Sequence, residues 1–157
     1  MTKNTTSIKI KKITPDAIMP TRGSEYAAGW DLYANSYEGI KSDNWSLIIP
    51  PKSTIKIGTG FAIAIPNGCF GGIYARSGLA TKQGLAPANK VGVIDSDYRG
   101  EVIVALYNHS DLPMTIHKGD RIAQLVVQEY LPFNLLETDE LDDTERGESG
   151  FGSTGTN

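Results

Sequence analysis

Short runs rich in Val and Ile recur along most of this chain, and turn residues separate them about every 8–12 positions. The runs are SIKIKKI (7–13), WSLIIPP (45–51), STIKIGTGFAIAIP (53–66), VGVI (91–94), EVIVALYN (101–108), MTIHKGD (114–120) and RIAQLVVQEYL (121–131). The segments PNG, GG, SDLP and KGD carry the turn signals. Segments of strand length at this spacing predict an all-β fold, either a sandwich, a jelly roll or a barrel.

One short helix interrupts the strand pattern, in RSGLATKQG (76–84). Ser77 is placed to cap its first turn, and Gly84 follows its last turn, where glycine commonly ends a helix. The length of 157 residues predicts a single domain. We divide the chain into a β body, residues 1–136, and a C-terminal arm, residues 137–157.

The arm differs from the body in composition. Its acidic part, ETDELDDTERGE (137–148), holds seven acids and one base, a charge of −6, whereas the whole chain carries −3. Such a segment is typical of a solvated tether. The glycine-rich end, RGESGFGSTG (146–155), reads alone as a disordered tail. Its N–H groups, hydroxyls and arginine can also form a nest for an anion, although it is not a Walker A loop.

The composition argues against several classes of protein. The longest apolar run, FAIAI (61–65), is too short to span a membrane, and the N-terminus has no apolar signal-peptide core. No cluster of Lys and Arg exceeds KIKK (9–12), which disfavours a nucleic-acid surface. Cys69 is the only cysteine, so an internal disulfide is excluded. We expect a cytoplasmic protein. In a eukaryote the nucleus is a second expected compartment, and for a viral protein the cytoplasm is that of the host cell.

Candidate catalytic residues gather in GVIDSDYRGEVIVALYN (92–108), where two apolar runs flank the turn DSDYRG. This pattern predicts a β-hairpin. Asp95 ends the first run, where its carboxylate can orient or deprotonate a water molecule, or can only satisfy backbone N–H groups of the turn. Tyr98 can stack on a ligand or simply cover the turn. The spacing alone leaves both pairs of alternatives open.

The segment ARSGLA (75–80) places Arg76, Ser77 and Gly78 at the expected start of the helix. Backbone N–H groups at a helix start favour an anion, and arginine adds a bidentate donor. Ordinary capping beside a surface arginine explains the same residues equally well.

Two further segments have polar residues with structural and functional interpretations. AAGWDLYA (27–34) contains Asp31, and KGDRIAQL (118–125) carries Gln124 on an expected strand. Read in isolation, Asp31 is an acidic residue of a turn, and Gln124 lies on the polar face of a strand.

Taken in order, five segments resemble the motifs of the trimeric deoxyuridine triphosphatase (dUTPase) family. They are AAGWDLYA, ARSGLA, GVIDSDYRGEV, GDRIAQL and RGESGFGSTG, which together span residues 27–155. The family hydrolyses dUTP to dUMP and pyrophosphate, which supplies dUMP for thymidylate synthesis and keeps uracil out of DNA. The resemblance implies a distorted jelly roll or β-barrel, and a homotrimer with three active sites at its subunit interfaces.

The resemblance assigns catalysis to Asp95, which positions and activates the water that attacks the α-phosphorus. Tyr98 is expected to pack against the deoxyribose and to exclude a ribose 2′-hydroxyl. The hairpin backbone is expected to read the uracil edge and to reject the methyl group of thymine. The residues implied at the uracil are Asn89, Gly92, Val93 and Ile103.

For the triphosphate, the resemblance implies four contacting residues, which are Arg76, Ser77, Gly78 and Gln124. Mg²⁺ is the implied cofactor; it bridges the phosphate groups and completes its shell with water, so no direct protein ligand is expected. Asp31 is expected in the outer shell of the site.

The resemblance turns the arm into a lid. Arg146 is expected to reach the γ-phosphate, and Phe151 to stack on the uracil, with Gly152, Ser153 and Thr154 beside the phosphates. Ser149 replaces a glycine that is common before Gly-Phe-Gly, at a cost on the order of 1 kcal/mol where that position requires a positive φ. Trp30 stands where the family usually has Tyr or Phe.

Two other functions compete with this interpretation. A dCTP deaminase, which shares the fold, needs a catalytic Glu where this chain has Ala105, so the missing base disfavours deamination. A non-catalytic nucleotide-binding relative is disfavoured by the intact Asp95, Tyr98 and arm residues.

Overall fold

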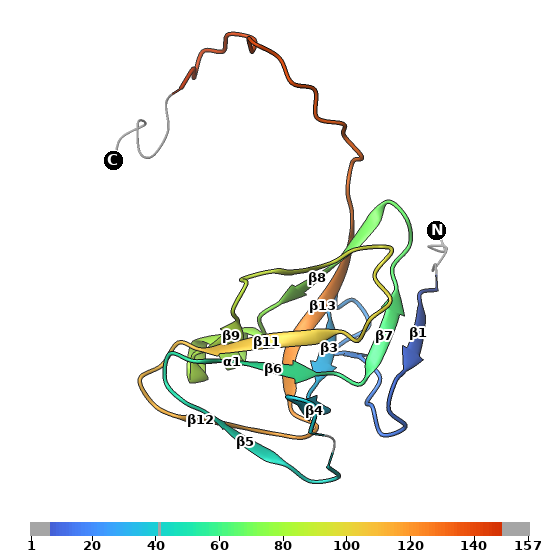
Figure 1. The fold of residues 1–157 in the computed structure, drawn as a ribbon, viewed down its shortest axis with the longest axis vertical. Helices are drawn as coiled ribbons and strands as arrows, with labels where there is room; N and C mark the ends of the chain where they lie inside the picture. The colour runs from blue at the N-terminus through green and yellow to red at the C-terminus, as the bar shows by residue number, and fades with distance from the viewer. Residues whose placement is uncertain (1–6, 41, 149–157) are drawn as a thin grey trace.

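The structure, a computed structural model, describes residues 7–40 and 42–148 (Figure 1). The described residues form short strands and one helix, α1, which runs from Ser77 to Gln83. The strands are β1 Lys9–Lys12, β2 Thr21–Arg22, β3 Trp30–Tyr33, β4 Ser36–Tyr37, β5 Ser46–Ile49, β6 Thr54–Gly58, β7 Phe61–Ala64, β8 Cys69–Tyr74, β9 Leu85–Pro87, β10 Gly92–Ile94, β11 Ile103–Asn108, β12 Met114–His117 and β13 Arg121–Glu129.

Antiparallel pairing arranges these strands in two larger sheets and two ribbons. The five-stranded sheet has the order β10-β8-β13-β3-β2, and the four-stranded sheet has the order β4-β6-β11-β9. β1 pairs with β7, and β12 pairs with β5. The prediction of an all-β jelly-roll fold with one short helix is confirmed, and the described strands form these separate sheets rather than one closed barrel.

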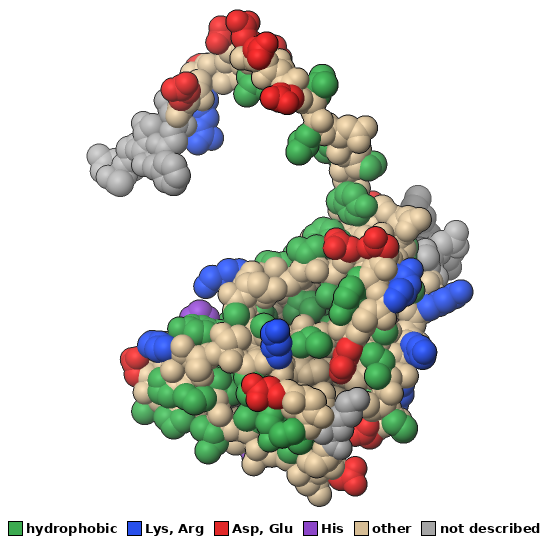
Figure 2. All heavy atoms as spheres, in the orientation of Figure 1, with side chains coloured by type: hydrophobic (Ala, Val, Ile, Leu, Met, Phe, Trp, Pro, Cys, Tyr) green, Lys and Arg blue, Asp and Glu red, His purple; other side chains and the backbone are tan. Residues whose placement is uncertain are grey.

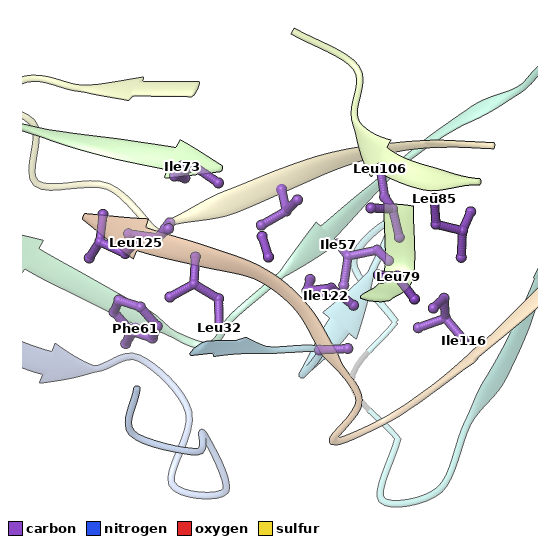
Figure 3. Close-up of a cluster of buried hydrophobic side chains, with 14 of the residues drawn as sticks. Leu32, Ile57, Phe61, Ile73, Leu79, Leu85, Leu106, Ile116, Ile122 and Leu125 are labelled. Atoms are coloured by element: carbon purple, nitrogen blue, oxygen red, sulfur yellow. The ribbon is translucent and has the colours of Figure 1, made fainter. Parts of the chain in front are cut away.

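In the described residues, a buried cluster of aliphatic side chains, Phe61 and Trp45 joins the sheets (Figure 3). Alternation along the strands explains how it forms. In β11, Val104 and Leu106 point into the core, whereas Ile103 is exposed on the opposite face. Because side chains of a strand alternate between its faces, each core strand also presents a second row of side chains outward.

The predicted hairpin over residues 92–108 is wrong. β10 pairs with β8, whereas β11 pairs with β6 and β9, so the two runs belong to different sheets. Their apolar patterns required burial but did not specify a partner. The turn between them, which contains Asp95 and Tyr98, therefore passes from one sheet to the other.

β8 was not predicted because its glycines were read as a turn. Gly71 and Gly72 lie inside this strand. A Cβ at Gly71 would lie 3.0 Å from Leu125 Cδ1 and 3.3 Å from Ile94 Cβ. The glycine therefore lets β8 fit closely between β13 and β10, which is a packing role and not a turn.

The helix prediction is correct in its range and wrong in its cap. The N-cap is Arg76, with φ −82° and ψ 124°, and no side chain caps the helix; Ser77 is its first residue. Gly84 ends the helix in the left-handed conformation with φ 69°, as predicted. In residues 7–40 and 42–148, no helix combines the length and apolar character that a membrane crossing requires.

After β13 the chain leaves the sheet and extends away from the body (Figures 1 and 2). Residues 130–148 form neither helix nor strand. Several large apolar side chains of this segment are exposed, with Leu135 fully so. The division of the chain into a body of residues 1–136 and an arm of residues 137–157 stays a prediction.

One ion pair attaches the loop before β2 to the turn before β13. Lys118 Nζ lies 2.5 Å from Asp16 Oδ2 and also donates to the carbonyl of Ser42 at 3.0 Å. Hydrogen bonds from Lys118 and then from Thr14 lower the pKa of Asp16 from 3.8 to about 2.

Because the folded pKa lies below the unfolded value, Asp16 stabilises the fold above about pH 4, and this stability is lost as the pH falls through about 2. Near neutral pH, the urea concentration at the midpoint of unfolding is therefore expected to be higher for the wild-type protein than for Asp16→Asn. The difference between the two midpoints is expected to disappear between pH 4 and pH 2. The effect is small since the carboxylate is nearly half exposed. Urea denaturation across this pH range measures it, and a constant difference between the two proteins would contradict the assignment.

Candidate functional site

The carboxylate of Asp31, on β3 of the five-stranded sheet, is held between two arginines. Arg76 Nε donates to Asp31 Oδ1 at 2.7 Å, and Arg121 Nη1 donates to Asp31 Oδ2 at 3.1 Å. The Asp31 side chain is only 14% exposed. Arg76 also donates through Nη1 to the carbonyl of Arg121 at 3.4 Å. We call Asp31, Arg76 and Arg121 the arginine–aspartate cluster.

Gln124 lies next to this cluster on β13. Its register partner on β3 is Asp31, and on β8 it is Tyr74. Its Nε2 donates to the carbonyl of Ala75 at 2.9 Å. A Cβ at Gly29 would lie 2.6 Å from Gln124 Oε1, so the glycine before β3 makes room for this amide. Gln124 is thereby fixed beside the residue that precedes Arg76.

Ser77 and Gly78 extend the same region at the start of α1. Both are exposed, and a Cβ built at Gly78 meets no atom within 4 Å. This surface is therefore open to a ligand. The residues predicted for the phosphates, Arg76, Ser77, Gly78 and Gln124, with Asp31 beside them, are brought together.

A second group of predicted residues surrounds a depression of about 260 Å³. It is lined by Lys56, Ile73, Pro87, Asn89, Gly92, Ile103, Val104 and Ala105. A Cβ at Gly92 would lie 3.2 Å from Asn89 Nδ2, so the glycine allows the amide to lie close to the backbone of β10. Asn89, Gly92 and Ile103, which the resemblance assigns to the uracil, thus line one depression. Val93 lies on the other side of β10 and is 59% exposed.

Asp95 follows β10, in a turn closed by a hydrogen bond from Tyr98 N to the Asp95 carbonyl at 3.2 Å. The Asp95 side chain is exposed, and among the described residues no donor bonds to its carboxylate. The interpretation of this side chain as a turn-capping group is therefore unsupported. With Val93, it lines a second depression that also includes Cys69, Phe70 and Tyr130.

Tyr98 packs on the turn itself. Its Oη donates to the carbonyl of Glu101 at 3.0 Å. A Cβ at Gly100 would lie 2.6 Å from the ring carbon Cζ, so the glycine lets the ring lie over the backbone. The ring stays 42% exposed, which leaves it available to a ligand near Asp95.

The two groups are separated within one chain. In the five-stranded sheet, β10 and β3 lie three strand spacings apart, which is about 14 Å. The registers Ile94↔Gly71, Gly71↔Val127 and Gln124↔Asp31 add an offset along the strands of about four residues between Asp95 and Asp31, or about 13 Å. The separation is therefore roughly 20 Å.

Of the predicted arm residues, the described part of the chain includes only Arg146. Arg146 belongs to the extended segment after β13 and is exposed. The predictions for Ser149, Phe151, Gly152, Ser153 and Thr154 lie outside the described residues. In the part of the chain that is described, no three His, Cys, Asp or Glu side chains form a cluster that could hold a metal ion.

Sequence reasoning missed Arg121. Simple alternation places Arg121 and Gln124 on opposite faces of a strand, because they are three positions apart. A β-bulge between Arg121 and Ala123 reverses this relation. Two consecutive buried residues, Ile122 and Ala123, mark the bulge, and an apolar pair inside an otherwise alternating strand is the one sequence signal that could have revealed it.

Comparison with known proteins gives one consistent result. The dUTPase family matches residues 15–155. The deoxyuridine 5′-triphosphate nucleotidohydrolase of Debaryomyces hansenii is 43% identical over 153 residues, which cover 96% of this chain and 89% of that protein. The corresponding protein of Paramecium bursaria Chlorella virus 1 is 44% identical and covers 95% of this chain and 98% of its own length.

Solved structures agree in fold. A point mutant of the Staphylococcus bacteriophage 80alpha dUTPase, solved with dUpNHpp, has a TM-score of 0.84 at 27% identity and covers 97% of this chain and 100% of that chain. A phage phi11 dUTPase, whose structure reveals the coordination of a structural Mg(II) ion, has a TM-score of 0.71 at 23% identity and covers 86% of this chain and 98% of its own.

The pairing of Asp31 with two arginines predicts a stability effect. Asp31→Asn keeps the shape of the side chain but leaves two guanidinium groups facing a neutral amide in a partly buried position. We expect it to lower the free energy of unfolding by about 1–3 kcal/mol, measured by urea denaturation. The matched control is Asp111→Asn, which removes the exposed pair with Lys52 and is expected to cost less than about 0.5 kcal/mol. Equal effects of the two substitutions would contradict this account of the cluster.

Proposed function

The chain belongs to the dUTPase family, and on that premise we propose how its own residues carry out the reaction. It is a nucleotide hydrolase that acts on dUTP. The proposal is that water attacks the α-phosphorus, releasing pyrophosphate and dUMP. The observation that carries it is the exposed carboxylate of Asp95, which follows β10, lines a depression together with Val93, and is engaged by no described donor.

Asp95 orients and activates the attacking water. A carboxylate without a competing hydrogen bond can accept one from water, and its position at the end of β10 is fixed by strand pairing to β8. Holding a nucleophile in line lowers the barrier mainly by orientation. We therefore assign positioning as its larger contribution and proton abstraction as the smaller one.

The base lies in the depression at β10. The backbone of Gly92 and Val93 and the amide of Asn89 offer the donors and acceptors that the uracil edge requires, and Ile103 supplies an apolar wall. The tight approach at Gly92 supports exclusion of the thymine methyl group. Tyr98 packs on the deoxyribose with its exposed ring face and leaves no room for a 2′-hydroxyl.

The phosphate chain lies at the arginine–aspartate cluster. Arg76 and Gln124 donate to phosphate oxygens, together with Ser77 and the backbone of Gly78. Bound Mg²⁺ would supply neutralisation of part of the phosphate charge. The Asp31 carboxylate would accept hydrogen bonds from the water shell of the ion, in the outer shell of the site.

Two subunits are needed to build one site. Asp95 and Asp31 of the same chain are roughly 20 Å apart by strand spacing, farther than a single triphosphate extends. This separation supports a homotrimer in which one chain supplies the uracil depression and Asp95, and a neighbour supplies the arginine–aspartate cluster.

The arm closes over this shared site. The extended course of residues 130–148 (Figure 1) supports an arm, residues 137–157, that reaches beyond its own body. Arg146 contacts the γ-phosphate, Phe151 stacks on the uracil, and Gly152, Ser153 and Thr154 contact the phosphates. Closure then waits for the substrate that supplies its packing partners, and Ser149 weakens closure where that position requires a positive φ. We place the reaction in the cytoplasm, where dUMP serves thymidylate synthesis.

Asp95→Asn tests the chemistry. The substitution keeps the shape and removes the negative charge, so turnover of dUTP is expected to fall by at least about 100-fold, while the affinity for dUpNHpp changes little. Pyrophosphate release with Mg²⁺ measures turnover, and calorimetry measures binding. If Asp95→Asn hydrolysed dUTP at the wild-type rate, Asp95 would have only a structural role in the turn.

As a control, pyrophosphate release by the wild-type protein is measured with each of four nucleotides. We expect release from dUTP and little from dTTP, dCTP and UTP, because of the tight base depression and the Tyr98 ring. If the wild-type protein released ammonia from dCTP, its activity would be deamination and not the proposed hydrolysis.

Deletion of residues 146–157 tests the lid. Turnover of dUTP is expected to fall to a small fraction of the wild-type value, with circular dichroism and native mass showing an intact trimer, because the arm lies outside the core. Deletion of residues 156–157 alone is the matched control and should retain activity. A fully active chain without residues 146–157 would remove the arm from the mechanism.

A further inference from the structure

We propose that Arg121 is a positioning residue for the phosphate chain: it holds Asp31 so that Asp31 aims the guanidinium of Arg76 at the substrate. The inference rests on the proposed function for the identity of the substrate. Its structural part, the contact from Arg121 through Asp31 to Arg76, stands on the geometry alone.

The β-bulge brings Arg121 to the correct face of β13. The register partner of Arg121 is Tyr33 and that of Gln124 is Asp31, with a shift between Arg121 and Ala123. Tyr33 and Asp31 are two residues apart, so they share one face of β3. Arg121 and Gln124 therefore share that face as well. Bulges of this kind commonly redirect a side chain next to an active site.

The hydrogen bonds then define what each guanidinium can still do. Arg76 uses Nε for Asp31 and Nη1 for the carbonyl of Arg121. Its remaining nitrogen, Nη2, makes no hydrogen bond among the described residues and keeps two N–H donors. A fork held at two of its nitrogens presents the third in a fixed direction, which is what recognition of a phosphate oxygen requires.

Arg121 also sets the charge of the cluster. Asp31 alone would neutralise Arg76 and weaken its attraction to an anion. With two arginines and one carboxylate, the cluster carries a net charge of +1. Because each Asp31 oxygen accepts from a different arginine, the carboxylate cannot rotate toward Arg76 without losing Arg121. Removal of Arg121 therefore has two effects. It lowers the net positive charge of the cluster, and it leaves the orientation of the Arg76 guanidinium less fixed.

The contacts assign the effect to Arg76 and not to direct contact by Arg121. Arg76 is held at two nitrogens, whereas Arg121 is held at one, and Arg76 directly precedes the open surface of Ser77 and Gly78. A residue that acts through Arg76 loses its importance when Arg76 is absent. A residue that binds phosphate itself does not.

A double-mutant cycle on the full-length protein separates these cases. The variants are Arg121→Ala, Arg76→Ala and the double variant, with kcat and KM measured for dUTP and the dissociation constant measured for dUMP. We expect Arg121→Ala to lower kcat/KM for dUTP by about tenfold or more, since a misaligned binding group can cost up to 100-fold. We expect dUMP affinity to change less than twofold, and the double variant to match Arg76→Ala.

Two further variants keep the result interpretable. Arg121→Lys keeps a cation near Asp31 but lacks the planar fork, so it should recover part of the loss and should fold if Arg121→Ala does not. Arg22→Ala removes an arginine of the same sheet whose guanidinium lies over the ring of Trp30, 4.3 Å from its centroid, and should hydrolyse dUTP as the wild type does.

The inference fails if Arg121→Ala keeps wild-type kcat/KM, or if the losses from Arg76→Ala and Arg121→Ala multiply in the double variant. Failure of the proposed function looks different, because the wild-type protein itself would then release no pyrophosphate from dUTP. In that event the Nε–H signal of Arg76 in ¹⁵N NMR still tests the contact. It should be protected from exchange in the wild type and lose protection in Arg121→Ala, and unchanged protection would overturn the inference.

Discussion

The pairing of the Asp31 carboxylate with the guanidinium groups of Arg76 and Arg121 holds together the residues of the candidate phosphate site. It joins β3, the residue before α1 and the first residue of β13, three segments far apart in the sequence. Two side chains of this region, Gln124 and Arg121, depend on local features of the backbone. Gln124 has room because of Gly29, and Arg121 reaches the cluster because β13 contains a bulge. Strand pairing fixes these positions before any ligand arrives, so the donors are already aimed.

The order of the strands separates the two groups of predicted residues. It keeps β10 and β3 three strands apart in the five-stranded sheet, so the turn that bears Asp95 lies far from the arginine–aspartate cluster of its own chain. In the homotrimer that we propose, association of chains would bring the two groups together without distorting either. The extended segment after β13, with its exposed apolar and acidic residues, suits a part of the chain that finds its contacts outside its own body.

Much of this arrangement follows from sequence, and the exceptions have physical causes. The strand spacing predicted an all-β fold, and Gly84 correctly marked the helix end, because both depend on local conformation. The hairpin over residues 92–108 was wrong, since apolar alternation requires burial without choosing a partner, and β8 supplied the partner through glycines that resembled a turn. Ser77 was misread as a cap because Arg76 adopts the extended conformation instead. Arg121 was missed because a bulge changes which face a side chain occupies. The grouping of Arg76, Ser77, Gly78 and Gln124 was anticipated only through the family motifs, not through spacing.

The most direct test of a site assembled from two chains around a preset arginine–aspartate cluster is a crystal structure of the wild-type protein with dUpNHpp and Mg²⁺. The account predicts that Asp31 keeps both arginines, that Nη2 of Arg76 and the Gln124 amide contact phosphate oxygens, and that the Asp95 carboxylate nearest the α-phosphorus comes from a different chain. A triphosphate bound by Asp95 and Arg76 of one chain, or an Arg76 that leaves Asp31 to reach it, would contradict the account.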